Sequence, residues 1–411
     1  MNKITKNQIE QLKPSATLAI NEKSKILEKG GKKIYRFGFG QSPFPVPEAI
    51  VSSLKKNSNK HQYLPMQGLE ELRLEIANYL NKNNNNNFTK ENIVIGPGTK
   101  ELMFHTQIAF AGEVLLPAPS WVSYQPQAVV AQNKVHWLQT NRDTNWFPAA
   151  DLLEEKIKKI KEKKLLLLMN SPNNPSGKVC KNLKEIAEVA KKHKLIILSD
   201  EIYSQLTFNN DYKSISNFYP EGTIVSSGLS KWCGAGGWRL GFFAIPNELD
   251  ELKKSLIKLC SESFTSVSAP IQYAAIEAYK GDHSSYIDNV RKILSCVGNY
   301  VYENLNSNKI ILDKPDGGFY LFPEFLNAKF SSSSEMCEDI LKKTGVALLP
   351  GSDFGLENHK MIARLSYTDF DGGAFLSHTS GSKKLDDADL RKYAPNIVDG
   401  VSKLKEWSNL L

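Results

Sequence analysis

Short apolar segments alternate with longer amphipathic segments through the middle of the chain. The stretches between the apolar segments, such as 183–193, carry apolar residues three and four positions apart, as helices do. Alternation of helices with fully apolar strands predicts an α/β fold with a mostly parallel sheet that is covered on both faces. The strands that this pattern predicts are 92–95, 113–116, 134–138, 164–169, 194–198, 223–226 and 240–245.

The same pattern divides the chain into three segments. Residues 1–30 lack a strong core pattern, and we expect an arm followed by a short amphipathic helix. The whole segment 1–45 would pack with the small domain. Residues 46–295 hold the strand–helix alternation and would form the large domain. Residues 296–411 mix helices, glycine-rich turns and short strands, which predicts a smaller α+β domain. Ligands of a parallel sheet bind beyond the carboxyl ends of its strands, so we expect the site there.

Composition narrows the class of protein. The 411 residues are 41% hydrophobic and 23% charged, as in ordinary soluble proteins. The longest apolar run, 165–169, is too short to span a bilayer, and the amino terminus has no signal-peptide core. Five scattered cysteines without a CxxC pair suit reduced thiols. We therefore expect a cytoplasmic protein that does not bind membranes.

Metal and nucleic-acid binding are not expected either. The seven histidines form no pair with ligand-like spacing, so the sequence predicts no metal site. The net charge of +8 is spread along the chain, and its densest cluster, 156–164, is interrupted by apolar and acidic residues. That cluster is typical of the solvated face of a helix.

The most specific motif is the sequence GLSKWCGAGGWRLG at 228–241. Lys231 follows a predicted strand, and Arg239 comes eight residues later among several glycines. A buried lysine near other cations has a lowered pKa and can form a Schiff base with a carbonyl cofactor. The arginine fork suits a phosphate, and glycines let the backbone approach it. The alternative interpretation is a flexible loop with a surface lysine.

Three further motifs lie upstream, each directly after a predicted strand. The sequence DEIY begins at Asp200, where a carboxylate can keep a pyridinium nitrogen protonated or simply cap a helix. The sequence SPNNPSG at 171–177 is by itself turn chemistry. The sequence GPGTK at 96–100 opens a predicted helix, whose free N–H groups make an anion site.

Taken together, these motifs resemble the signatures of the class I and II aminotransferases, the fold-type I family of enzymes that use pyridoxal 5′-phosphate (PLP). The resemblance covers nearly the whole chain, with the motifs in the family's order. It implies a large PLP-binding domain with a mostly parallel seven-stranded sheet and a smaller α+β domain. It also implies that Lys231 binds PLP through a Schiff base and moves the proton between the substrate α-carbon and the cofactor.

The resemblance assigns roles to other residues as well. Asp200 would pair with the pyridine nitrogen, while Tyr203 and Asn174 would bond the 3′-oxygen. Trp121 would stack on the ring beside the substrate. The residues that would hold the phosphate are Gly98, Thr99, Lys100, Ser230, Arg239 and, from a partner subunit, Tyr63. The residues that would hold the substrate, besides Trp121 and Asn174, are Gly40 and Arg364 at the α-carboxylate and Lys100, Ser15 and Thr17 at a second carboxylate.

Tyr63 in that role implies a homodimer with shared active sites. Three positions depart from the family pattern. Ser171 and Ser176 replace an asparagine and a threonine, and Gly228 stands where many members have a phosphate-binding serine.

The function implied is an aminotransferase that works by a ping-pong mechanism on an L-amino acid and a 2-oxo acid, with aspartate or glutamate favoured by Lys100. Aromatic, alanine or prephenate substrates remain open, as does a PLP-dependent lyase on the same fold. A non-catalytic regulator is disfavoured, because neither end holds an additional DNA-binding region.

Overall fold

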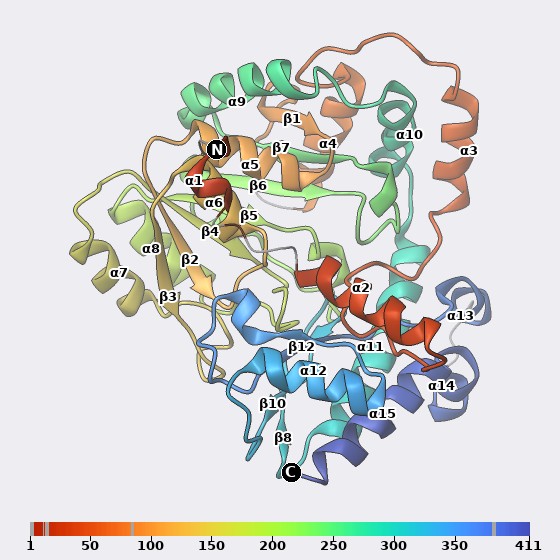
Figure 1. Ribbon diagram of the computed structural model, residues 1–411. Coiled ribbons are helices and arrows are strands. Elements are labelled where there is room, and N and C mark those ends of the chain that lie inside the picture. Colours follow the sequence, from red (N-terminus) through yellow and green to blue (C-terminus); the bar gives the residue numbers. More distant parts are fainter. Residues whose placement is uncertain (1–3, 11, 13–15, 84–85, 380–383) are drawn as a thin grey trace.

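A large central sheet with its helices forms one part of the molecule, and a group of helices with short strands forms the other (Figure 1). The computed structural model describes residues 4–10, 12, 16–83, 86–379 and 384–411. Within these ranges, no helix has both the length and the apolar character needed to cross a membrane.

The central sheet has seven strands in the order β1-β7-β6-β5-β4-β2-β3. Strand β7 runs antiparallel to both of its neighbours, and the other adjacent pairs are parallel. The mostly parallel seven-stranded sheet that the sequence predicts is therefore confirmed. The strands are β1 (Ile93–Gly96), β2 (Glu113–Ala118), β3 (Val135–Gln139), β4 (Leu165–Asn170), β5 (Ile196–Asp200), β6 (Thr223–Gly228) and β7 (Gly241–Ala244).

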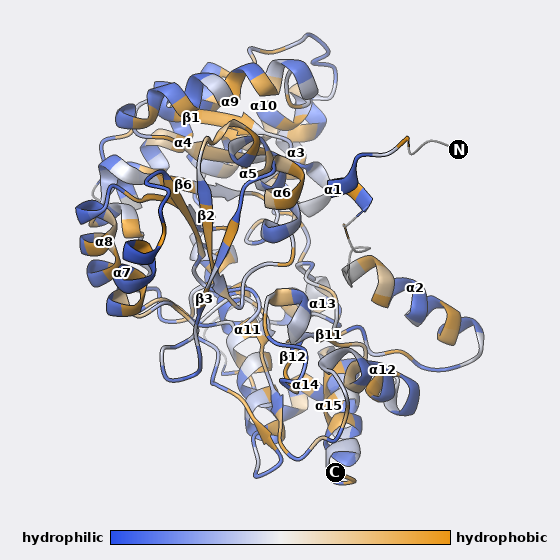
Figure 2. Cartoon of the chain, turned by 60° about the vertical axis from the view of Figure 1, so that its left-hand side comes forward, coloured by the Kyte–Doolittle hydropathy of each residue, from blue (hydrophilic) through white to orange (hydrophobic). Residues whose placement is uncertain are grey.

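Helices cover both faces of this sheet, because successive side chains of a buried strand point to opposite sides. In β4, Leu166 and Leu168 pack with α5, α6 and α9, whereas Leu165 and Leu167 pack with α7 and α8. Helices α4 and α10 extend the second layer over β1 and β7. Figure 2 shows the apolar strands between helices that have polar outer surfaces. These helices are α4 (Glu70–Asn83), α5 (Thr99–Ala109), α6 (Tyr124–Ala131), α7 (Ala150–Lys159), α8 (Leu183–Lys192), α9 (Asp250–Ser263) and α10 (Ala269–Lys280).

The carboxyl-terminal part packs helices around two small antiparallel sheets, β10-β8 and β11-β12-β9. Its core is continuous with the core under α4 and α10. The strands are β8 (Ile310–Ile311), β9 (Tyr320–Leu321), β10 (Glu324–Phe325), β11 (Leu349–Pro350) and β12 (Ala363–Ser366). The helices are α11 (Ser284–Leu305), α12 (Ser333–Thr344), α13 (Gly372–His378), α14 (Asp387–Tyr393) and α15 (Pro395–Ser408).

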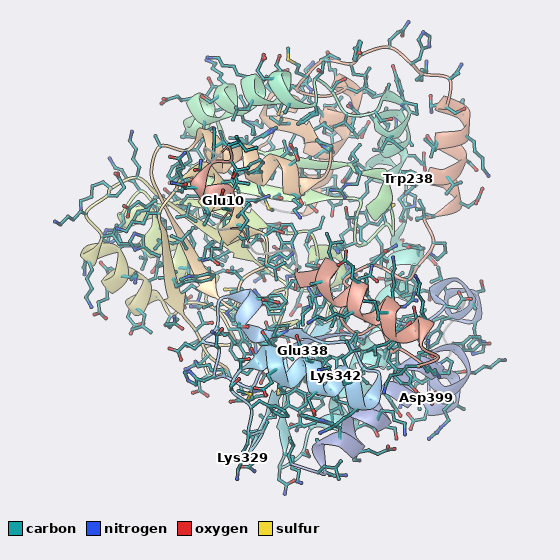
Figure 3. The ribbon with its side chains drawn as sticks, in the orientation of Figure 1. Glu10, Trp238, Lys329, Glu338, Lys342 and Asp399 are labelled. Carbon is teal, nitrogen blue, oxygen red and sulfur yellow. The ribbon has the colours of Figure 1, made fainter. Side chains whose placement is uncertain are left out.

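The amino-terminal helices are α1 (Asn7–Glu10), α2 (Ala16–Lys29) and α3 (Glu48–Asn57). Helix α2 packs Ile20 against an apolar cluster that includes Leu341 of α12. An ion pair joins Lys23 to Glu338, which Figure 3 labels on α12 below α2. Helix α11 runs without a break past residue 295, so it links the two parts of the molecule. The division into segments 1–45, 46–295 and 296–411 stays a prediction.

The carboxyl ends of β1, β2, β4, β5 and β6 meet at one edge of the central sheet, because these five strands share one direction. The segments that follow these strands are 97–100, 119–124, 171–178, 201–203 and 229–240. Together with the last residues of the strands, they carry the motifs GPGTK, SPNNPSG and DEIY and the glycine-rich segment around Lys231. The fold therefore gathers these motifs at the edge where parallel sheets bind ligands.

Candidate active site

A cavity of about 500 Å³ lies at this edge of the sheet, and we call it the site cavity. Its walls include eleven of the residues that the sequence predicts for the site. They are Gly40, Thr99, Lys100, Trp121, Asn174, Asp200, Tyr203, Ser230, Lys231, Arg239 and Arg364. Two larger hollows, of about 870 and 890 Å³, flank α14 and contain none of the predicted residues. The chemistry-bearing side chains therefore converge on the smaller cavity.

Lys231 follows β6 and reaches the cavity partly exposed. Its Nζ donates a hydrogen bond of 2.5 Å to the carbonyl oxygen of Gly40 and lies 5.5 Å from the ring centre of Tyr203. Desolvation by the surrounding protein lowers the pKa of the Lys231 ammonium, although Tyr320 and Asp200 act in the opposite direction. A lowered pKa raises the share of neutral amine, the form that attacks a carbonyl group.

Asp200 is the last residue of β5 and is buried. Its Oδ2 accepts a hydrogen bond of 2.7 Å from the hydroxyl of Tyr124, and its Oδ1 accepts a long one from the backbone N–H of Ile202. Burial raises the pKa of the Asp200 carboxyl to about 6, against the effect of those donors. A protonated, positively charged group in the cavity would stabilise the ionised Asp200 carboxylate, since a buried charge is costly unless it is paired.

The loop after β4 holds Asn174 by two bonds. Its backbone N–H donates 2.7 Å to Asn170 Oδ1, and its side-chain Oδ1 accepts 3.0 Å from Arg364 Nη1. With the amide oxygen used in this way, the Asn174 NH₂ group is left to donate into the cavity. Ser176, which replaces the family's threonine, still bonds Asn173 through its hydroxyl. Ser171 Oγ accepts from the backbone of Cys180, so both departures have hydrogen-bond partners.

Arg364 lies in β12 and is 3% exposed. Its two terminal nitrogens donate to Asn174 Oδ1 and to Gly38 O, at 3.0 and 2.7 Å, while Nε has no hydrogen-bond partner. Burial lowers the pKa of the Arg364 guanidinium. No carboxylate of the described residues forms an ion pair with it. Asp353 acts on the guanidinium electrostatically without forming an ion pair. A buried cation of this kind is the group that a substrate carboxylate would complete.

Two more cations line the cavity around the start of α5. Arg239 donates to the carbonyl oxygens of Gly236 and Pro97, at 2.9 and 3.2 Å. Lys100 Nζ lies 5.4 Å from the ring centre of Trp121, and burial, aided by Arg239, lowers the pKa of the Lys100 ammonium. Neither cation pairs with a carboxylate of the described residues, so this end of the cavity favours an anion.

Gly98 explains how Arg239 comes so close to the helix. Gly98 has φ +87° and caps the start of α5. A Cβ atom at this position would stand 2.3 Å from Arg239 Nη2. Glycine is therefore required twice, by its backbone angle and by the guanidinium beside it. The free N–H groups of the first helical turn then face the same place as Arg239, which is an arrangement for binding phosphate.

Comparison with known proteins decides the family. The model of the family described as aminotransferase class I and II matches residues 32–369. The chain belongs to this family. Its relatives include the aspartate aminotransferases of Bacillus sp. (strain YM-2), 31% identical with 89% of this chain and 95% of the relative covered, and of Geobacillus stearothermophilus, 31% identical with 88% and 93% covered.

Solved structures of aminotransferases agree with this assignment. The Thermus thermophilus aspartate aminotransferase with maleate superposes with a TM-score of 0.85 at 25% identity, over 98% of this chain and 99% of that one. The Thermotoga maritima aspartate aminotransferase gives 0.83 at 26% identity, over 98% and 100%. The resemblance that the sequence motifs indicate is thus confirmed, as are the fold-type I architecture and the activity of an aminotransferase.

Three predicted residues of this aminotransferase stand apart from these eleven. Tyr63 lies in the segment after α3 with an exposed fraction of 88%. Thr17 belongs to the first turn of α2. Ser15 lies outside the described residues. The individual roles predicted for the site residues, inside and outside the cavity, stay predictions.

Sequence reasoning missed two tyrosines of the aminotransferase site. Tyr124 donates to Asp200, and Tyr320 lines the cavity with its hydroxyl 3.0 Å from that of Tyr203. Both are almost fully buried among apolar residues, so in the sequence they are indistinguishable from core residues. The one usable signal was the spacing of Tyr124, three residues after Trp121, which brings the two rings to 5.4 Å.

Proposed function

We propose that this aminotransferase binds PLP in the site cavity and exchanges an amino group between a dicarboxylic L-amino acid, aspartate or glutamate, and a 2-oxo acid. One observation carries the proposal. The cavity combines a lysine amine and a buried carboxylate with three cations that have no carboxylate partner among the described residues. Such a site suits a cofactor with a carbonyl, a basic ring nitrogen and a phosphate, together with a substrate that brings further negative charge.

The residues present fit PLP group by group. Arg239 and the start of α5 offer donors for the phosphate, and the close approach of Arg239 to Gly98 supports a single compact binding place for it. Asp200 can accept a hydrogen bond from the ring nitrogen. The donors that remain for the 3′-oxygen are the NH₂ group of Asn174 and the hydroxyl of Tyr203. Lys231 supplies the amine for the aldehyde.

When bound, PLP supplies an electron sink for the negative charge that develops at the substrate α-carbon. Asp200 holds a proton at the ring nitrogen, and its burial keeps this interaction strong. Lys231 Nζ receives the proton from the α-carbon and returns it, which requires the neutral amine that desolvation favours. Gly40 O, which accepts from Lys231 at 2.5 Å, fixes the starting position of that amine.

The three cations support an acidic substrate. Arg364, which lines the site cavity together with Gly40 and forms no ion pair with a described carboxylate, would bind the α-carboxylate. Arg239 and the backbone N–H groups of α5 can neutralise the phosphate, which leaves the Lys100 ammonium for a second carboxylate. Ser15 and Thr17 are proposed to donate beside Lys100. The names of the relatives, and maleate in the Thermus thermophilus structure, support a dicarboxylic ligand. The amino donor and the 2-oxo acid would use the same place in turn, as a ping-pong mechanism requires.

The test is to mix the purified holoenzyme with each of the twenty amino acids and to follow the cofactor absorbance. We expect aspartate and glutamate to change the spectrum fastest and to release their 2-oxo acids in a one-to-one ratio with enzyme sites. A faster response to alanine or an aromatic amino acid would reject the proposed dicarboxylic substrate but not the aminotransferase activity. If the enzyme released elimination products and did not transfer the amino group, it would be a lyase.

A homodimer is part of the proposal. The phenol of Tyr63, 88% exposed in the single chain, would reach the phosphate in the partner subunit, and Met66 beside it is also exposed. Light scattering of the holoenzyme should give twice the mass of one chain. A fully active monomer would remove Tyr63 from the site.

A further inference from the structure

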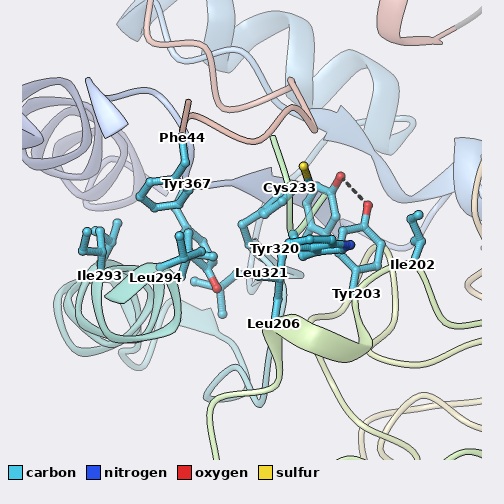
Figure 4. Close-up of a cluster of buried hydrophobic side chains, with 14 of the residues drawn as sticks. Phe44, Ile202, Tyr203, Leu206, Cys233, Ile293, Leu294, Tyr320, Leu321 and Tyr367 are labelled. Atoms are coloured by element: carbon cyan, nitrogen blue, oxygen red, sulfur yellow. Dashed lines mark hydrogen bonds between the residues drawn. The ribbon is translucent and has the colours of Figure 1, made fainter. Parts of the chain in front are cut away.

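Tyr320 joins three of the predicted site residues, although no sequence motif pointed to it. It is the first residue of β9 and is 2% exposed. Its hydroxyl lies 3.0 Å from the hydroxyl of Tyr203, and Figure 4 shows the two groups facing each other. Its ring centre lies 4.6 Å from the guanidinium carbon of Arg364. A Cβ atom on Gly40 would stand 2.0 Å from the Tyr320 hydroxyl oxygen, so Tyr320 also packs against the residue that accepts from Lys231.

We propose that Tyr320 is a positioning residue with two separable parts, a hydroxyl that turns the Tyr203 proton toward the cofactor and a ring that holds the Arg364 fork for the substrate carboxylate. This inference rests on the proposed function. It concerns how the chain's own residues are held and adds no step to the reaction.

The hydroxyl part follows from counting protons. Each phenol has one proton, and two phenols 3.0 Å apart share one hydrogen bond. If Tyr203 donates to Tyr320, Tyr203 has no proton left for an acceptor in the cavity. If Tyr320 donates to Tyr203, the Tyr203 proton is free to point into the cavity, and a donor that itself accepts a hydrogen bond is strengthened. An acceptor such as the 3′-oxygen of PLP therefore selects the second arrangement.

The ring part follows from the surroundings of Arg364. Its terminal nitrogens donate hydrogen bonds to Asn174 Oδ1 and Gly38 O. Tilting of the guanidinium out of its own plane must therefore be restrained by packing. The Tyr320 ring at 4.6 Å and the Phe354 ring at 5.2 Å supply that restraint. A guanidinium beside aromatic rings is also stabilised as a cation, which matters for a group with no carboxylate partner in the described chain.

The two parts predict different effects for two substitutions, both measured on the holoenzyme. Tyr320→Phe removes only the hydroxyl. We expect the dissociation constant of maleate, a dicarboxylate that cannot transfer an amino group, to stay within about 2-fold of wild type, since the ring remains. We expect kcat with aspartate to fall by about 2- to 12-fold. The pH midpoint of the cofactor absorbance should rise, because a 3′-oxygen with a weaker hydrogen bond holds the neighbouring proton more tightly.

Tyr320→Leu removes the ring as well. Here the dissociation constant of maleate and KM for aspartate should both rise, by about 2- to 30-fold, because the Arg364 fork loses its support. Phe325→Leu is the matched control: Phe325 is 2% exposed in β10, packs on Trp407 and is not one of the residues that line the site cavity. It should lower thermal stability and leave the maleate affinity and the pH midpoint at their wild-type values.

The result that overturns the inference is a Tyr320→Phe enzyme with wild-type kcat and pH midpoint, or one whose maleate affinity falls as far as that of Tyr320→Leu. The first outcome would make Tyr320 an ordinary core residue, and the second would show that its hydroxyl and its ring do not act separately. If Tyr320→Leu fails to fold, kcat and the pH midpoint of Tyr320→Phe still test the role of the hydroxyl. The maleate affinity of Tyr320→Phe still tests whether the hydroxyl and the ring act separately. A wild-type chain that binds neither PLP nor maleate would instead reject the proposed function, so the two failures are distinguishable.

Discussion

The two walls of the site cavity differ in how far they are complete without a ligand. On the sheet wall, the carboxylate of Asp200 accepts from Tyr124, and the loop that carries Asn174 is tied to Asn170. On the part of the lining that we call the cationic wall, Arg239 donates to backbone oxygens and Lys100 lies over a ring, and neither forms an ion pair with a described carboxylate. The first wall is preorganised by the chain, as an accurate catalytic site requires. The cationic wall favours anions that balance its charge, and the proposed phosphate and carboxylate ligands rest on this property.

The largest effect is expected from removing the amine of Lys231. Lys231→Ala should lose several orders of magnitude in turnover, because one side chain provides both the covalent attachment and the proton transfer. The variant should still bind PLP noncovalently, because Arg239 and the start of α5 are unchanged. Single-turnover kinetics with aspartate, together with equilibrium dialysis of PLP, measure the two quantities. Turnover within about 10-fold of wild type would exclude Lys231 as the catalytic base.

The next change removes the carboxylate of the sheet wall. Asp200→Ala should lower kcat/KM roughly 100-fold or more, with a much smaller loss of PLP affinity, since the charge would act on the electron sink and Arg239 with the start of α5 would still hold the phosphate. Asp200→Asn is the matched control, because it keeps an oxygen for Tyr124 and cannot keep the ring nitrogen protonated. It should be nearly as impaired as the alanine variant. A wild-type rate in Asp200→Ala would show that the pyridinium role is wrong.

On the cationic wall, Lys100→Met tests the acidic substrate. A charge-assisted contact contributes about 1.5–3 kcal/mol, so kcat/KM for aspartate should fall roughly 10- to 150-fold. Alanine and phenylalanine, which have no second carboxylate, should be turned over nearly as before. Steady-state kinetics with all three amino acids give the answer. Equal losses for the three would make Lys100 a phosphate contact and withdraw the aspartate assignment.

The last prediction concerns stability and not activity, and it rests on a second buried carboxyl, next to Asp200 in the chain. Glu201 accepts from Ser199 and Ser214, yet burial raises the pKa of its carboxyl to about 7. A raised pKa means that the folded state binds the proton more tightly than the unfolded state does. The protonated form therefore adds stability at low pH, and this stability is lost as the pH rises from about 5 through 7.

Glu201→Gln should consequently match wild type near pH 5 and exceed it at pH 8 by about 3 kcal/mol in the free energy of unfolding. Thermal and urea unfolding of both cofactor-free proteins between pH 5 and 8 measure this difference. A difference that does not change with pH would remove the buried charge as its cause.

The sequence predicted the central sheet well because buried parallel strands are encoded in short apolar runs. All seven predicted strands exist, with ends shifted by at most two residues. The reversed direction of β7 was not predicted, since its run GFFA is as apolar as that of a parallel strand. The two-residue strands of the carboxyl-terminal part, such as β8 and β9, are too short to leave a periodic pattern.

For the site, the sequence located residues whose chemistry is distinctive in their context. Lys231, Asp200 and Arg364 follow or lie within strands, and all three line one cavity. Tyr124 and Tyr320 were missed because their contacts with Asp200, Tyr203 and Arg364 form only in the folded chain. The role of Tyr63 stays a prediction, since its proposed contact lies across a subunit interface.

The most direct test of the central claim, that this aminotransferase carries PLP on Lys231, is reduction of the holoenzyme with borohydride followed by peptide mapping. The reduced cofactor should be found on the peptide that contains Lys231, with one label per chain and none in the Lys231→Ala variant. Label on Lys100 or on any other lysine, or no label on a protein that binds PLP, would contradict the account.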